Sequence, residues 1–195
     1  MDDLIAKAID KAAKGGATFS EVRVFGFKYE NISTRDGQIE TCGQYNDKGY
    51  GVRVIKDKAW GFASTAVIDE STVDEITKAA IKEAEATSRV QKKPIELTEE
   101  PIIKDKYKTP YTKNPFDIPL EEKIEILKKS DQIIMEQGDI IKSRSNSMNF
   151  YKIYLDYGNS EGTRITQEEL FTGATVSAIA IAEDNQSRNE GLYEM

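Results

Sequence analysis

Histidine is absent from the 195 residues of this sequence. Because histidine is the usual general base of nucleophilic triads and the commonest zinc ligand, its absence excludes Ser-His-Asp, Cys-His and His-Glu-x-x-His sites within the chain. Carboxylates are abundant, but an acid–base pair needs a geometry across a cleft that adjacency in sequence does not supply, so we interpret them as solvated. They include Glu121-Glu122, Glu161, Glu168-Glu169 and Glu183-Asp184. We therefore predict no catalytic and no metal-ligating residue here, and single out no substrate-binding residue.

Cysteine occurs only once, at Cys42. A single thiol closes no intrachain disulfide, which fits a reducing compartment, and a reactive thiol needs a cationic neighbour or a helix N-terminus. Cys42 instead follows a predicted strand with Glu40 nearby, so we interpret it as a structural thiol. The start, Met1-Asp2-Asp3, has neither the basic nor the apolar region of a secretory signal. We expect a cytoplasmic location.

Long apolar runs are also lacking, because the longest, around Val176 to Ala182, is far shorter than the roughly 20 residues of a membrane span. The 27 Lys and Arg residues are outnumbered by 34 Asp and Glu, giving a net charge of −7. This charge repels a phosphate backbone and an anionic membrane surface, so we expect neither partner. The basic groups at Lys92-Lys93 and Lys104 to Lys108 have acidic neighbours and are interpreted as solvated segments.

No glycine cluster has the spacing of a phosphate-binding loop or a dinucleotide fingerprint. Turns, bulges or close strand crossings explain these clusters better. They are Gly49-Tyr50-Gly51, Trp60-Gly61-Phe62 and Gly158 to Gly162. The sequence is 38% hydrophobic and 31% charged, a composition typical of an ordered core under a solvated surface.

Three helices are predicted from apolar residues at helical spacing. We expect them to end at Gly15-Gly16, near Ser88 and at Gly138. A capping box at Ser71 starts the second and Pro119 starts the third. The apolar stripes are Leu4, Ile5, Ala8, Ile9 and Ala12, then Val73, Ile76, Ala80, Ile81 and Ala84, then Leu120, Ile124, Leu127 and Ile134.

Short β-branched and aromatic runs between turn residues predict antiparallel meanders. Asp36-Gly37 offers the positive φ angles of a two-residue hairpin loop, and Lys56-Asp57-Lys58 makes a second reversal. The expected strands are Val22 to Tyr29, Ile32 to Arg35, Gln38 to Thr41, Tyr50 to Ile55, Ala59 to Thr65, Ile140 to Met148, Phe150 to Tyr157, Thr163 to Phe171 and Ala174 to Ala182. Because strands come in runs, the fold class is α+β, antiparallel meanders packed with about three helices.

Three segments follow from this pattern. Residues 1–90 form a helix, antiparallel sheet and helix unit, and residues 91–118 form an extended connection rich in proline and lysine. Residues 119–195 form a helix plus antiparallel strands of the same domain. In the first segment Phe25, Phe27 and Tyr29 alternate onto one strand face, opposite Val22 and Val24. We expect these aromatics to pack in a core, with a domain or subunit interface as the alternative.

A set of short motifs runs along the whole chain in a characteristic order. They are Gly16-Ala17-Thr18-Phe19-Ser20-Glu21-Val22-Arg23-Val24, Arg35-Asp36-Gly37-Gln38-Ile39-Glu40, Gly49-Tyr50-Gly51-Val52-Arg53-Val54-Ile55, Trp60-Gly61-Phe62-Ala63-Ser64-Thr65, Pro119-Leu120-Glu121-Glu122-Lys123 and Tyr157-Gly158-Asn159-Ser160-Glu161-Gly162-Thr163. In order and spacing this set resembles the N-terminal region of the TldD/PmbA family, also called the modulator of DNA gyrase family.

The resemblance implies an intracellular protein more than twice this length, in which a TldD-like and a PmbA-like (TldE) subunit pair. The TldD-like subunit is a zinc metallopeptidase acting on unfolded or short peptides, with its metal in a C-terminal His-Glu-x-x-x-His helix plus a distant cysteine. That motif is not in this sequence, and Cys42 does not match the ligand cysteine. We expect a non-catalytic N-terminal part, without zinc of its own, that walls a peptide cavity and supports the subunit interface.

Two other interpretations stay open. The chain could belong to the PmbA/TldE-like partner subunit, which lacks the metal motif, or it could be a stand-alone peptide- or protein-binding module. A His-Glu-x-x-x-His helix beyond Met195 distinguishes the first interpretation from these. The family's gyrase label does not imply DNA binding here, because the charge of −7 opposes it.

Overall fold

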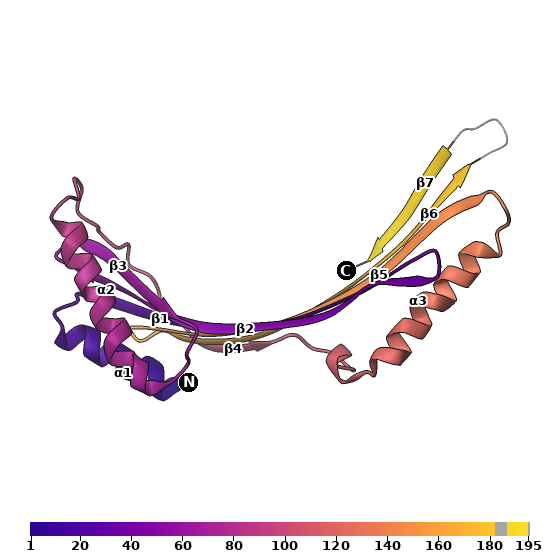
Figure 1. The fold of residues 1–195 in the computed structure, drawn as a ribbon. Coiled ribbons are helices and arrows are strands. Elements are labelled where there is room, and N and C mark those ends of the chain that lie inside the picture. Colours follow the sequence, from indigo (N-terminus) through magenta and orange to yellow (C-terminus); the bar gives the residue numbers. More distant parts are fainter. Residues whose placement is uncertain (182–186, 195) are drawn as a thin grey trace. The chain divides into compact units, whose positions relative to one another are not determined.

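The computed structural model describes residues 1–181 and 187–194, and its helices and strands confirm the α+β class (Figure 1). The strands form one sheet in the order β3-β2-β1-β5-β6-β4, with β7 paired to β6. The elements are α1 (Asp2–Lys14), β1 (Phe19–Arg35), β2 (Gln38–Lys56), β3 (Ala59–Thr65), the 3₁₀ helix η1 (Glu70–Thr72), α2 (Val73–Ser88), β4 (Lys104–Lys108), the 3₁₀ helix η2 (Pro115–Asp117), α3 (Leu120–Met135), β5 (Ile141–Asn159), β6 (Arg164–Ile181) and β7 (Ser187–Glu194).

The chain packs as two compact units. Unit 1 comprises residues 1–27, 47–108 and 153–169, and unit 2 comprises residues 28–46, 109–152 and 170–195. Four strands, β1, β2, β5 and β6, contribute residues to both units. The division expected from the sequence, at residues 1–90, 91–118 and 119–195, stays a prediction.

The strands are longer than the sequence pattern predicted. Val22 to Tyr29 and Ile32 to Arg35 are parts of one strand, β1, and the runs assigned to residues 38–41 and 50–55 are parts of β2. Polar residues between the runs were interpreted as breaks, but a strand with one solvated face accommodates them. The Asp36-Gly37 hairpin is confirmed, because both residues have positive φ, 50° and 80°.

Two strands were not predicted. β4 lies inside the segment expected to be an extended connection, and it pairs parallel with β6, so the sheet is not purely antiparallel. All five of its residues are exposed, and apolar and polar side chains do not alternate along it, so the usual sequence pattern of a strand is absent. β7 pairs antiparallel with the second half of β6. Ala182, the expected end of the last strand, lies outside the described residues.

In unit 1, α1 and α2 cover one face of β1, β2 and β3. Alternate residues of β1 and β2 point toward these helices, as period-two geometry requires. The buried core is Leu4, Ile5, Ala8, Ala12, Val22, Val24, Tyr50, Val52, Val54, Val73, Ala80 and Ala84. Both helix stripes predicted from the sequence contribute to it. α2 approaches β3 closely, because a Cβ on Gly61 would lie only 2.0 Å from the Ala80 carbonyl oxygen.

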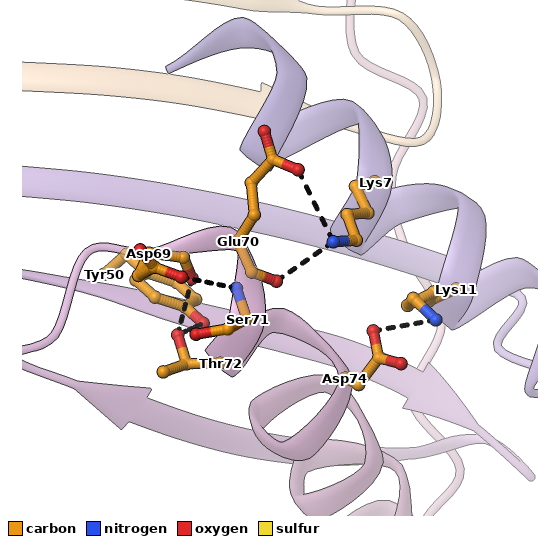
Figure 2. Close-up of polar contacts among 8 residues, drawn as sticks. All are labelled: Lys7, Lys11, Tyr50, Asp69, Glu70, Ser71, Thr72 and Asp74. Atoms are coloured by element: carbon orange, nitrogen blue, oxygen red, sulfur yellow. Dashed lines mark hydrogen bonds and ion pairs between the residues drawn. The ribbon is translucent and has the colours of Figure 1, made fainter.

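A polar network at one end of this unit ties α1 to α2 (Figure 2). Lys11 pairs with Asp74 at 2.7 Å, and Lys7 donates to the Glu70 carbonyl at 3.0 Å. The Tyr50 hydroxyl hydrogen-bonds the Thr72 hydroxyl at 2.7 Å where β2 meets the start of α2. The ammonium of Lys11 lowers the pKa of the Asp74 carboxyl. These contacts account for the network as helix docking.

In unit 2, α3 packs on the sheet through charged residues as well as through an apolar cluster in which Leu127 meets Ile32 and Phe150. The sequence predicted that Leu120, Ile124, Leu127 and Ile134 form the buried stripe, but of these only Leu127 is fully buried and Leu120 is exposed. Lys123 and Asp131 take the buried positions instead. They do so because the strands beneath carry their counterions: Lys123 pairs with Glu30, and Asp131 pairs with Arg144 at 2.9 Å.

Candidate functional site

The helix-free face of the sheet in unit 1 carries two of the three aromatic residues noted in the sequence. Phe25 and Phe27 lie on the face of β1 opposite Val22 and Val24, with ring centroids 6.3 Å apart. Phe25 is 45% exposed. The expectation that this residue packs in a core is therefore wrong, because α1 and α2 cover only the other face. Exposed apolar side chains gathered on one face are typical of an interaction surface.

A shallow groove of about 400 Å³ lies on this face. We call it the aromatic groove and define it by Arg23, Phe25, Phe27, Gly49, Gly51 and Phe62. Its shape depends on glycine at position 51, since a Cβ there would lie only 2.7 Å from the Phe62 ring. The Gly49-Tyr50-Gly51 cluster is thus explained as a close approach within the sheet, as predicted, with Phe62 of β3 lying over β2.

A second hollow, of about 250 Å³, contains a polar cluster centred on Glu21. Arg53 pairs with the Glu21 carboxylate at 2.7 Å, and the Tyr157 hydroxyl donates to the same carboxylate at 3.0 Å. The Arg53 guanidinium also lies 4.3 Å from the centre of the Trp60 ring, a cation–π contact. Residues of the segment 97–103 close the other side of this hollow.

The electrostatics of this cluster are those of a satisfied ion pair. Glu21 is almost fully buried, and its two oxygens accept from Arg53 and Tyr157. Burial, and then the hydrogen bond to Glu21, raises the pKa of the Tyr157 hydroxyl, so the phenol stays protonated at neutral pH. A buried carboxylate paired on both oxygens holds its partners in place. The cluster is suited to shaping a surface.

In unit 2, the face opposite α3 carries three stacked tyrosine rings. The centroids of Tyr29 and Tyr151 are 4.3 Å apart, and those of Tyr29 and Tyr45 are 6.1 Å apart. Asn149 accepts hydrogen bonds from the Tyr29 hydroxyl and from Asn31. Burial, with a smaller effect from Tyr151, raises the pKa of Tyr29. The row is a neutral aromatic surface.

In the part of the chain that the structure describes, no three His, Cys, Asp or Glu side chains come close enough to hold an ion. Cys42 is exposed on β2, Glu121-Glu122 are exposed on the first turn of α3, and Glu168 pairs with Lys108. Glu161 lines the hollow around Glu21, whereas Glu183-Asp184 lie outside the described residues. The predicted absence of catalytic and metal-ligating residues stays a prediction.

The cluster of Glu21, Arg53, Trp60 and Tyr157 was missed by sequence reasoning. Its members come from four strands, and only the strand order brings them together. Period-two alternation from Phe25 does place Glu21 on the helix-free face, and that signal was available.

No helix in the described ranges is long and apolar enough to cross a bilayer.

The described residues form an α+β domain with two hollows on an open sheet face of unit 1. Comparison with known proteins assigns the family. Residues 20–86 match the model described as PmbA/TldA metallopeptidase domain 1, and residues 113–194 match the PmbA/TldA metallopeptidase central domain. Together the two matches span most of the chain, which therefore belongs to the PmbA/TldD family.

Individual relatives agree. The chain is 27% identical over 152 residues to the metalloprotease MJ0996 of Methanocaldococcus jannaschii, covering 77% of this chain and 33% of that protein. It is 25% identical over 149 residues to a metalloprotease of Archaeoglobus fulgidus, covering 76% of this chain and 32% of the other. The chain thus spans about a third of the length of these curated relatives.

Solved structures show the same fold. A putative modulator of DNA gyrase from Bacteroides thetaiotaomicron superposes with a TM-score of 0.76 at 17% identity, covering 99% of this chain and 44% of that one. TldE from Thermococcus kodakarensis gives a TM-score of 0.71 at 17% identity, covering 98% and 42% of the two chains.

Proposed function

We propose that this chain is the non-catalytic N-terminal part of a cytoplasmic, TldD-like zinc metallopeptidase that hydrolyses unfolded or short peptides. One observation carries the proposal: the chain matches the first and central domains of a metallopeptidase family while spanning about a third of metalloprotease relatives. Zinc would supply Lewis-acid chemistry in the rest of the longer protein. A chain without histidine and without a cluster of metal ligands in its described part does not fit that ion.

The role proposed for this chain is to wall the peptide cavity and to support contact with a paired TldD/PmbA-type subunit. The open face of unit 1 supports this role, since it presents the aromatic groove and the hollow around Glu21. The aromatic groove is suited to bind through apolar burial and shape. Peptide contact by β-addition to a free strand edge is the accompanying hypothesis.

The test uses the complete natural protein. Its intact mass and metal content are measured beside the gene sequence downstream of Met195. A chain more than twice this mass, a His-Glu-x-x-x-His helix and about one zinc per subunit that carries this helix support the proposal. A natural product of 21.9 kDa that binds no metal and cleaves no unfolded peptide would refute it.

A second candidate is the PmbA/TldE-like partner subunit, which the fold likeness to TldE favours. It predicts a long natural protein without the His-Glu-x-x-x-His helix and without bound zinc. Peptidase activity would then appear only after mixing with a TldD-like subunit. The third interpretation, a stand-alone binding module, predicts a short natural protein that binds peptides. It would show no peptidase activity, either alone or after mixing with a TldD-like subunit.

A further inference from the structure

The outer edge of β3 carries a backbone donor that a helix side chain occupies. β3 is the terminal strand of the sheet order, paired only with β2 within the described ranges. The Phe62 N–H points away from β2 and donates to the Glu83 carboxylate of α2 at 2.8 Å. Because strand residues alternate in hydrogen-bonding direction, Trp60 and Ser64 also turn their backbone groups outward. An edge of this kind is a template for another strand.

The aromatic groove adjoins this edge. Phe62 is 53% exposed and lies on the groove, since its cross-strand partner is Arg53 and its ring rests on Gly51. A strand added at Phe62 in the hydrogen-bonded register would place its opposing side chain on the same face as the Phe62 ring. That side chain would lie against the outer side of the Phe62 ring, because β3 separates an added strand from β2 and β1. The geometry therefore selects an apolar residue at this position.

Glu83 adds a charge preference. Its carboxylate accepts one backbone N–H and has no Lys or Arg partner among residues 1–181 and 187–194. Its neighbours one turn away on α2 are Ala79, Ala80, Ala86 and Thr87, which carry no charge. In an added strand, the residues flanking the one opposite Phe62 point to the other face, toward α2. A lysine or arginine there complements Glu83.

We propose that an extended peptide segment adds to β3 at Phe62, with an apolar side chain against the exposed Phe62 ring and a flanking basic residue on Glu83. The peptide carbonyl replaces the Glu83 carboxylate as the acceptor of the Phe62 N–H. This deepens the proposed function and rests on it for the choice of a peptide as occupant. It assigns a preferred class of peptide, basic-apolar-basic, to a site within this chain.

The experiment titrates the isotope-labelled chain with acetyl-Thr-Thr-Lys-Phe-Lys-Thr-Thr-amide and follows amide chemical shifts. Shifts are expected at Phe62, Ser64 and Gly51. A probe that is N-methylated at its Phe amide cannot pair with the edge and is expected to cause none of them. Replacing the probe Phe by Ser removes the contact with the Phe62 ring and is expected to weaken binding about tenfold or more.

Variants of the chain separate the contacts. Glu83→Gln is expected to weaken the lysine probe several-fold and to remove most of its salt dependence. Glu75→Gln, the same charge change at an exposed site of α2, is the matched control and is expected to leave affinity unchanged. Phe62→Ser is expected to abolish binding while preserving the amide spectrum elsewhere, because this side chain is half exposed.

Three results would overturn the proposal. One is the absence of shifts at Phe62 with the lysine probe at millimolar concentration. Another is equal binding of the N-methylated probe, which would leave a contact with the Phe62 ring without β-addition. The third is a Glu83→Gln chain that self-associates while neither form binds the probe, which would make Glu83 only a guard of the edge. If the natural protein is an active zinc peptidase but this chain does not bind the probe, only this inference is refuted. If the chain binds the probe but the natural protein is metal-free and inactive, only the proposed function is refuted.

Discussion

Removing the Lys123 ammonium should destabilise unit 2 strongly, because it leaves the Glu30 carboxylate buried without its cation. The Lys123 side chain is only 3% exposed, and its ammonium contacts Glu30 and lies 4.9 Å from the centre of the Phe150 ring. Gln44 also donates to Glu30, at 3.2 Å, but a neutral amide does not compensate the charge. Breaking one side of a buried pair costs about 3–5 kcal/mol. We expect Lys123→Met to lose stability of this size.

The double variant Lys123→Met with Glu30→Leu provides the decisive comparison. Replacing both members of a buried pair by apolar residues is neutral or stabilising, by up to about 4 kcal/mol, so the double variant should regain most of the loss. Lys128→Met, on an exposed position of the same helix, should change stability by about 0.5 kcal/mol or less. Urea denaturation followed by far-ultraviolet circular dichroism gives the free energies. A double variant as unstable as Lys123→Met would refute the reasoning, because an unpaired Glu30 carboxylate could not then explain the lost stability.

Three further predictions concern unit 1. Gly61→Ala should cost about 1–3 kcal/mol in thermal melts, because its Cβ would lie 2.0 Å from the Ala80 carbonyl oxygen. Gly26→Ala should be close to neutral, because its Cβ would lie 3.5 Å from the nearest atom, the Lys48 Cβ. Equal losses of stability in the two variants would refute this prediction. Asp74, whose pKa the hydrogen bond from Lys11 lowers, contributes stability that is present above its unfolded pKa and is lost as pH falls through the folded value. Asp74→Asn should therefore flatten the acid side of the melting-temperature profile, and an unchanged profile would contradict the assignment. Tyr157, whose pKa burial raises, contributes stability that is lost as pH rises through that pKa. Tyrosinate absorbance of the wild type and Tyr157→Phe should reveal one late-ionising tyrosine at this position.

The helices of unit 1 could be predicted because local sequence settles them. The stripes from Leu4 to Ala12 and from Val73 to Ala84 face one apolar sheet surface, so burial follows from spacing alone. The Asp36-Gly37 hairpin is equally local, because positive φ at two successive residues selects that pair. These elements need no knowledge of distant residues.

The α3 face could not be predicted in the same way. Helical spacing gives the same direction to Lys123, Leu127 and Asp131, and a pattern of apolar residues alone assigns lysine and aspartate to solvent. Their burial depends on Glu30 of β1 and Arg144 of β5, which are distant in sequence. Long-range charge pairing therefore overrides the apolar pattern.

The proposed docking edge shows the same limit at a functional surface. Sequence alternation identifies the aromatic face of β1, and the stripe of α2 places Glu83 away from its buried side. Neither pattern says that β3 ends the sheet or that Glu83 reaches the Phe62 N–H, because both depend on the strand order and on the close approach at Gly61. The glycine that lets α2 approach β3 is thus also what brings a carboxylate to the free edge. Gly61→Ala, by moving α2 outward, should weaken the Glu83 contact and raise hydrogen exchange at the Phe62 amide before it unfolds the unit.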